Sequence, residues 1–149
     1  ITVTKAAESG LNNLSLNKTV EASSFVKDAE APKYALDGDP STKWCAVGPD
    51  NHNITIDLGE VKSINEVHIQ HAEVGGENPD MNTEEYKIEV SEDGENFTTV
   101  SLREGNTLGE TVDAFKQVNA RYVRLTILKA TQGSDSAARI YGIDVFGLE

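Results

Sequence analysis

Residues 54–71 read ITIDLGEVKSINEVHIQH, two runs in which apolar and polar side chains alternate on either side of a glycine. Side chains of a β-strand point alternately to opposite faces, so each run predicts a strand with one apolar face. The first run would bury Ile54 and Ile56, and the second would bury Val67 and Ile69. The sequence therefore predicts two half-buried strands here.

The same alternation recurs along the chain, with turn signals at the spacing of an all-β domain. Asp93-Gly94 separates two of the runs, and Asp-Gly is typical of a tight hairpin turn. No stretch keeps a helical period over three turns, and only residues 32–36 could form one helical turn. Besides 54–58 and 64–71, the expected strands cover residues 86–91, 97–102, 112–115, 122–128 and 140–146. The pattern predicts an all-β fold, an antiparallel β-sandwich or barrel, in one domain.

The first residues differ from the rest of the chain. Residues 1–12 are small and polar without a clear period, so we interpret them as a linker or edge segment and residues 13–149 as the domain. Ile1 in place of an initiator Met indicates a mature form or an excised fragment. No charged-then-apolar leader and no apolar run of membrane-spanning length is present.

Composition excludes several classes of partner. The 149 residues carry a formal net charge of −12, which argues against nucleic acid and against anionic membranes. Cys45 is the single cysteine, so no internal disulfide can form and the core must provide the stability. No nucleophile elbow, HExxH helix or phosphate loop is present, so we do not expect an enzyme.

Residues 34–44, YALDGDPSTKW, carry the strongest metal signal. Asp37 and Asp39 flank a glycine, and Thr42 adds a hydroxyl. Calcium prefers such oxygen ligands, many of them backbone carbonyls. The alternative is an Asp-Gly turn capped by hydroxyl groups.

Five motifs together resemble one known family. They are YALDGDPSTKWCA (34–46), ITIDLGEVKSINEVHIQHAE (54–73), YKIEVSEDGENFTTV (86–100), ARYVRLTI (120–127) and ARIYGIDVFG (138–147). In this order they resemble the factor V/VIII type C or discoidin family, and within it the family 32 carbohydrate-binding modules of bacterial glycoside hydrolases. The resemblance runs from Leu14 to Gly147. It implies a discoidin-like jelly-roll sandwich, a monomeric, non-catalytic sugar-binding module, secreted or on the bacterial cell surface and attached to a parent enzyme.

The resemblance also implies a structural calcium ion. Its ligands would be the carbonyl oxygens of Tyr34, Asp39 and Tyr141, the carboxylate of Asp37, and Thr42. Gly142 stands where the family usually supplies a Glu. The missing charge should weaken calcium binding, because ligand charge tunes calcium affinity.

The sugar site implied by the family uses His71, Arg103 and Asn106, and we add Glu73 and Asn82 from the long loop 73–83. The expected ligands are terminal galactose, N-acetylgalactosamine or N-acetylglucosamine. A neutral imidazole donates one hydrogen bond and accepts another, which suits a sugar hydroxyl. Arg103 offers several N–H donors in a planar group, and the Asn106 amide can bind a neighbouring hydroxyl.

Each assignment has an alternative. His71 keeps phase with Val67 and Ile69, so it could be a core histidine at a strand end. A large fall in melting temperature in His71→Ala would identify it as a core residue. If His71 is a site residue, the same substitution should abolish sugar binding and leave the melting temperature nearly unchanged. Arg103 and Asn106 could belong to a solvated turn. The alternative function is a structural spacer or protein-docking and adhesion sandwich without sugar binding.

Overall fold

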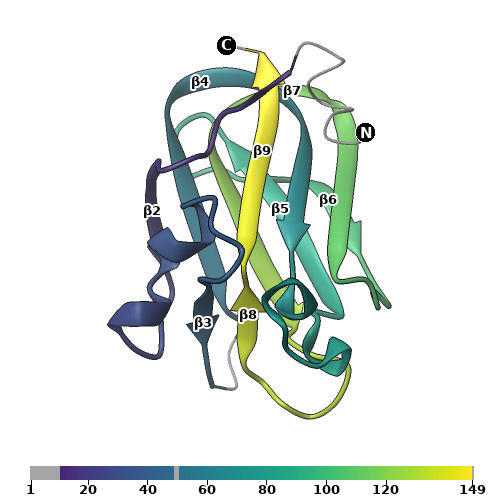
Figure 1. The fold of residues 1–149 in the computed structure, drawn as a ribbon. Helices are drawn as coiled ribbons and strands as arrows, with labels where there is room; N and C mark the ends of the chain where they lie inside the picture. Colours follow the sequence, from purple (N-terminus) through teal and green to yellow (C-terminus); the bar gives the residue numbers. More distant parts are fainter. Residues whose placement is uncertain (1–10, 49–50, 149) are drawn as a thin grey trace.

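The computed structural model describes residues 11–48 and 51–148, and their strands all pair antiparallel. The predicted all-β class is confirmed. Two long strands, β4 (Asn53–Gln70) and β7 (Glu110–Lys129), pair with each other along most of their length and carry the rest of the sheet (Figure 1). They determine how the two layers are joined.

Both long strands pass from one layer to the other. The start of β4 pairs with β2 (Thr19–Ala22), and its end pairs with β9 (Gly142–Leu148). Between these parts the β4–β7 register shifts from Asp57 to Lys62. Gly59 has a φ of 95° there, a left-handed conformation that glycine adopts without strain. The separate strands expected at 54–58 and 64–71 are thus one bent strand, and so are those at 112–115 and 122–128.

The first layer contains β2, the start of β4, the end of β7, β5 (Glu85–Ser91) and β6 (Thr98–Arg103). The second layer contains β1 (Asn12–Asn13), β9, the end of β4 and the start of β7. A small separate sheet pairs β3 (Trp44–Ala46) with β8 (Ala138–Ile140). In Figure 1, β9 lies in front of β5, so the two layers face each other across the core.

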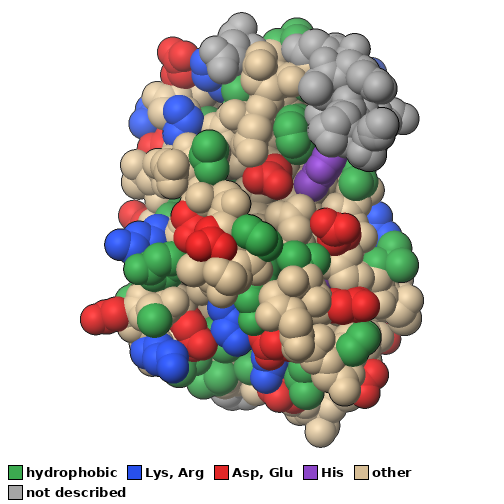
Figure 2. Space-filling model, in the orientation of Figure 1, with side chains coloured by type: hydrophobic (Ala, Val, Ile, Leu, Met, Phe, Trp, Pro, Cys, Tyr) green, Lys and Arg blue, Asp and Glu red, His purple; other side chains and the backbone are tan. Residues whose placement is uncertain are grey.

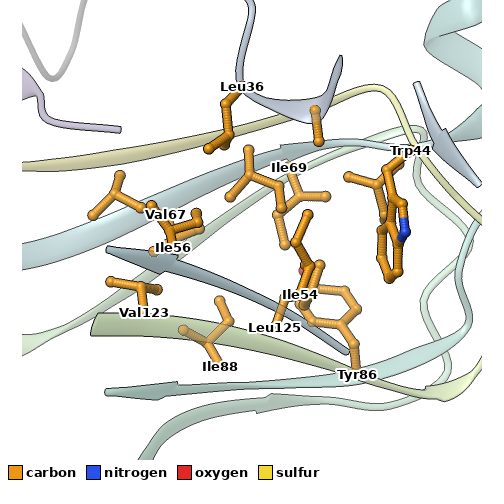
Figure 3. Packing of buried hydrophobic residues seen from close by; sticks show 14 of the residues in the cluster. Leu36, Trp44, Ile54, Ile56, Val67, Ile69, Tyr86, Ile88, Val123 and Leu125 are labelled. Carbon is orange, nitrogen blue, oxygen red and sulfur yellow. The ribbon is translucent and has the colours of Figure 1, made fainter. Parts of the chain in front are cut away.

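The core contains the residues that the alternation predicted. Ile54 and Ile56 of the first layer and Val67 and Ile69 of the second belong to one buried cluster (Figure 3). Trp44 is also fully buried, and its indole N–H donates to the Ser24 carbonyl at 2.9 Å. Its ring therefore stabilises the core and is not a surface platform for a ligand.

Four short 3₁₀ helices occur in the connections: η1 (Asp28–Glu30), η2 (Pro32–Ala35), η3 (Ala72–Gly75) and η4 (Pro79–Met81). The single turn expected at residues 32–36 is η2. The turns η3 and η4 shape the loop between β4 and β5, which the sequence left as an irregular connection. In η4, the Asn78 side chain caps the first turn by accepting from the Asp80 N–H.

Of the predicted segment 1–12, residues 1–10 lie outside the described part of the chain. Asn12 pairs with Gly147 at the edge of the main sheet. Among the described residues, no helix is long and apolar enough to cross a membrane.

Candidate functional site

The predicted sugar-contacting residues gather on two connections at one end of the sandwich. His71, Glu73 and Asn82 lie on the β4–β5 connection, whereas Arg103 ends β6 and Asn106 follows it. Backbone hydrogen bonds fasten the connections together: His71 N–H donates to Gly109 O at 2.8 Å, and Asn106 N–H donates to Glu84 O at 2.9 Å. The loops thus form one assembly, which we call the loop end.

His71 lies beneath the surface of the loop end. Its side chain is 0% exposed, so in this conformation a ligand has no access to the ring, as expected of a core histidine. Nε2 lies 3.0 Å from Thr111 Oγ1, while Nδ1 has no partner among the described residues. Burial, together with the charge of Arg103, lowers the pKa of His71 to about 4, so the ring is neutral at pH 7.

A chain of hydrogen bonds connects His71 to Arg103. The Tyr86 hydroxyl lies 2.5 Å from Asp113 Oδ2 and 2.8 Å from Thr111 Oγ1. Because a phenol has one proton and the shorter contact is to a carboxylate, Tyr86 donates to Asp113 and Thr111 donates to Tyr86. Thr111 then accepts from the Nε2–H of His71, which leaves Nδ1 as an unpaired acceptor. Sequence patterns linked none of the three to this site, because Tyr86 lies on β5 and Thr111 and Asp113 lie on β7, far along the chain from His71.

Arg103 is fixed at the rim of the loop end. Its Nε donates to Asp113 Oδ1 at 3.0 Å, and Nη2 donates to the Val112 carbonyl at 3.2 Å. The Asp113 side chain is 4% exposed and the Arg103 side chain 29% exposed. A buried carboxylate therefore orients a guanidinium whose outer part meets solvent.

The two asparagines are occupied by internal hydrogen bonds. The Asn82 side chain accepts from the Glu73 N–H at 2.9 Å and donates to the Glu73 carboxylate at 3.2 Å. The Asn106 amide donates to the Thr83 carbonyl at 2.9 Å and accepts from the Leu108 N–H at 3.1 Å. Both asparagines are buried, so they hold the loops in shape and leave Glu73 and Arg103 as the predicted residues that reach solvent.

Gln132 is a further residue of the loop end that the sequence did not reveal. Its side-chain amide donates to the backbone carbonyls of Asn82 and Asn106, both at 2.8 Å. It ties a third loop, between β7 and β8, to the other two. A lone Gln in a polar loop carries no sequence signal for such a role.

A cluster of charged groups joins the same β4–β5 connection to residues in and beside the small β3–β8 sheet. The Glu77 carboxylate accepts from Lys43 at 2.7 Å and Tyr141 at 2.6 Å and pairs with Arg139 at 3.0 Å. A Cβ on Gly75 would come within 1.9 Å of the Tyr141 ring, so a glycine is needed for the η3 turn to rest on that ring. The cluster fixes the connection against the small β3–β8 sheet.

The predicted metal loop brings four oxygens together. Thr42 Oγ1 lies 2.6 Å from Asp37 Oδ2, 3.1 Å from Asp39 O and 3.3 Å from Tyr34 O. One hydroxyl proton cannot serve three acceptors, so this donor set suits a hard cation such as calcium. The turn alternative is also visible, because Asp37 Oδ1 accepts from the Asp39 N–H at 3.0 Å.

The charge available to a cation at this loop is small. The Asp39 carboxylate points to Ser41. It accepts one hydrogen bond from the Ser41 N–H at 2.9 Å and one from the Ser41 hydroxyl at 2.6 Å. The described residues contain no group of three His, Cys, Asp or Glu side chains that could hold a metal ion. Tyr141, the fifth predicted ligand, joins β8 to β9 and donates its N–H to the Gln70 carbonyl at 2.8 Å. A Cβ on Gly142 would lie 2.0 Å from Gln70 Oε1, so the Gln70 side chain fills the space where a Glu would begin.

Comparison with known proteins identifies relatives of this fold. The sequence model of one protein family, the F5/8 type C domain, matches residues 19–141. Chitosan-binding module 1 of a chitosanase/glucanase from Paenibacillus sp. IK-5 superposes with a TM-score of 0.79 at 28% identity, covering 91% of this chain and 99% of that module. CpGH89CBM32-5 from Clostridium perfringens, solved with GalNAc-β-1,3-galactose, superposes with a TM-score of 0.79 at 26% identity, covering 91% and 100%. Other matched structures are family 32 carbohydrate-binding modules of bacterial enzymes.

The sequence also matches part of a much longer protein. It is 28% identical over 162 aligned residues to a polysaccharide lyase 8 family protein, HylA, of Enterococcus faecalis. The alignment covers 100% of this chain and 11% of that protein.

Proposed function

Because the chain belongs to the F5/8 type C domain family, we propose that it is a non-catalytic carbohydrate-binding module. Its ligands are terminal galactose, N-acetylgalactosamine or N-acetylglucosamine, bound at the loop end. The module tethers a secreted or cell-surface bacterial enzyme that degrades glycans. The match to 11% of a lyase-family protein and the carbohydrate-binding modules among the structural relatives support this architecture.

The observation that carries the sugar-binding proposal is the fixed guanidinium of Arg103. Asp113, 4% exposed, holds it at the rim, so little side-chain entropy is lost when its outer N–H groups donate to sugar hydroxyls. Glu73 is exposed beside the same loops and offers an acceptor. Arg103 thus supplies donors and Glu73 an acceptor for sugar hydroxyls, which both give and receive hydrogen bonds.

The proposed affinity is weak. A monosaccharide of roughly 15 heavy atoms at about 0.3 kcal/mol each gives about 4–5 kcal/mol, a dissociation constant near 1 mM. Several modules on one surface would then be needed for firm attachment. Nanomolar binding of a monosaccharide would contradict a shallow, exposed site.

A calcium ion belongs to the proposal as a structural element. The oxygens of Tyr34, Asp37, Asp39 and Thr42 would hold it, and Tyr141 O would complete the set. When bound, the ion would tie the η2–β3 loop together by coordination. The low charge of the donor set favours weak binding.

One observation favours the alternative of a spacer or protein-docking sandwich. His71, Asn82 and Asn106 are buried, and the two asparagine side chains are engaged in internal bonds. A module whose loop end serves only its own stability would show the same pattern. Sugar titration separates the two functions.

The test is a glycan array of the intact chain, followed by titration of the best terminal monosaccharide. Arg103→Ala should weaken binding at least about tenfold, because a hydrogen bond to a charged group contributes about 1.5–3 kcal/mol. Lys116→Ala removes the same charge from an exposed site on β7 and should bind like the wild type. A blank array with folded protein, or equal affinity in both variants, would contradict the proposed site.

A further inference from the structure

A groove of about 600 Å³ crosses the outer face of the first layer. Its floor is the outward side of β4 at Asn53, Thr55 and Asp57, its near wall is β2, and its far wall is the β5–β6 turn. The floor residues alternate with buried Ile54 and Ile56, so strand periodicity itself turns them outward. Pockets that bind small molecules span about 300–1,000 Å³, and this groove lies within that range.

The groove is remote from the loop end. Its far wall begins where β5 ends, whereas the loop end is fastened to Glu84, just before β5 begins. The 7 residues of β5 separate them by about 20 Å at about 3.3 Å per residue. A ligand in the groove therefore leaves Arg103 and Glu73 free.

Two half-buried aromatic rings line the groove: Phe97 lies on the far wall, and Tyr122 lies on β7, where it pairs with Asp57 of the floor. The Arg124 guanidinium carbon lies 3.9 Å from the centre of the Phe97 ring. A Cβ on Gly94 would lie 3.2 Å from the Tyr122 ring, so the turn rests against this ring. This side of the groove, formed by β7 and the β5–β6 turn, thus combines ring surface, which packs against the apolar face of a pyranose, with N–H donors for its hydroxyls.

Hydrogen bonds and an ion pair hold the β5–β6 turn and the neighbouring Arg124 of β7 in place. Asp93 Oδ1 accepts from the N–H groups of Glu95 and Asn96 at 2.8 and 2.9 Å, and these bonds hold the pKa of Asp93 far below its usual range. Arg124 makes a two-pronged ion pair with Glu89, at 3.0 and 3.1 Å. Such a surface loses little conformational freedom when a ligand binds.

The charge of the groove selects against acidic ligands. Glu21, Asp57, Asp93 and Arg124 line it. Asp57 is paired with Arg121 and Arg124 with Glu89, so these charges cancel, and the carboxylates of Glu21 and Asp93 leave the groove net negative. Like charges facing one another across a binding surface cost affinity. Uronic acids and sulfated sugars are therefore disfavoured, whereas uncharged sugars and amino sugars are accepted.

We propose that this groove is a second glycan-binding site, which takes a short segment of an oligosaccharide without acidic groups. The module would then hold a chain by two separate contacts: a terminal sugar at the loop end and an internal segment on the sheet face. This site adds to the proposed function but does not depend on Arg103.

The test follows backbone amide shifts of the ¹⁵N-labelled intact chain during titration with four probes. These are the N-acetylglucosamine trimer, the glucosamine trimer, the galacturonic acid trimer and N-acetylglucosamine itself. The two non-acidic trimers should shift Thr55, Phe97 and Tyr122, whereas the acidic trimer should not. Phe97→Ala should weaken trimer binding about tenfold, the loss expected when an aromatic contact of this size disappears.

Thr55→Trp places a large side chain on the floor of the groove and should also remove trimer binding there. This second variant keeps the test valid if Phe97→Ala fails to fold. Arg103→Ala should leave the groove shifts intact and remove only those of the loop end. If neither non-acidic trimer shifts the groove residues, or if both groove variants bind as the wild type does, the second site is refuted. If the sugars shift the groove residues of the wild-type chain but none at the loop end, the proposed terminal-sugar site is refuted and the groove stands.

Discussion

Among single residues, His71 shows how burial determines chemistry at the loop end. Its Nδ1 is a buried acceptor without a partner among the described residues, and such a group costs about 1–3 kcal/mol. The bond from Nε2 to Thr111 and the contact with the Tyr86 ring, 5.6 Å between centroids, offset that cost. A protonated ring would instead place a buried charge near Arg103. His71 therefore works as a neutral residue that positions its neighbours.

The pH dependence of stability should show this neutrality. The folded-state pKa of about 4 lies below the ordinary value of 6.5, so the unfolded chain binds the extra proton between these two values. The free energy of unfolding should therefore fall as the pH drops from about 6.5 to 4, by about 3 kcal/mol from this group. His71→Gln cannot titrate, and the difference in slope between the two proteins, from urea unfolding at each pH, isolates the effect. Identical slopes would mean that His71 becomes protonated in the folded state near its ordinary pKa.

At the level of elements, alternation predicted the strands but not their joining. Ile54 and Ile56 gave the inward face of β4 correctly, yet the run breaks at Gly59, and no local pattern shows that the strand continues around the bend. The loop end was predicted in part. The resemblance brought His71, Arg103 and Asn106 to one end of the fold, where the structure also places them.

What the sequence did not show is how those residues are used. Asp113 reads as one more polar position in an alternating strand, although it is 4% exposed and orients Arg103. Thr111 lies 40 residues from His71, and only the pairing of β7 with β4 brings the two together. Burial and pairing of this kind depend on long-range packing, which periodicity within a single strand does not report.

Calcium should act on one element, the loop from η2 to β3. Binding only to the folded state, it should raise the melting temperature of the chain relative to a chelator. Asp37→Asn should remove that rise, since Asp37 supplies the one carboxylate of the oxygen cluster. Asp39→Asn is the matched control: its side chain points to Ser41 while its carbonyl stays in place, so the response should persist. Equal melting curves with calcium and with chelator would remove the ion from the proposal.

For the whole molecule, the dominant property is the net charge of −12. On the face shown in Figure 2, acidic side chains are spread among hydrophobic, uncharged and basic ones and do not form one patch. A net negative charge distributed over the surface repels acidic polymers at a distance. It does not concentrate the electrostatic field at one binding site. The proposed module would therefore recognise glycans through hydrogen bonds and ring contacts, and the repulsion among its own charges opposes the folded state.

Salt should separate these two consequences of charge. Raising NaCl from about 10 mM to about 1 M shortens the Debye length from about 30 to about 3 Å. Screening should relieve the repulsion among the excess carboxylates, so the melting temperature should rise by a few degrees, roughly the effect of 1 kcal/mol. Affinity for a neutral monosaccharide should stay within about twofold, because no ion pair forms with such a ligand. Calorimetric melting and sugar titration across the same salt series measure both. A steep loss of sugar affinity with salt would show that charge attraction drives binding, and would rule out recognition of neutral terminal sugars through Arg103 hydrogen bonds.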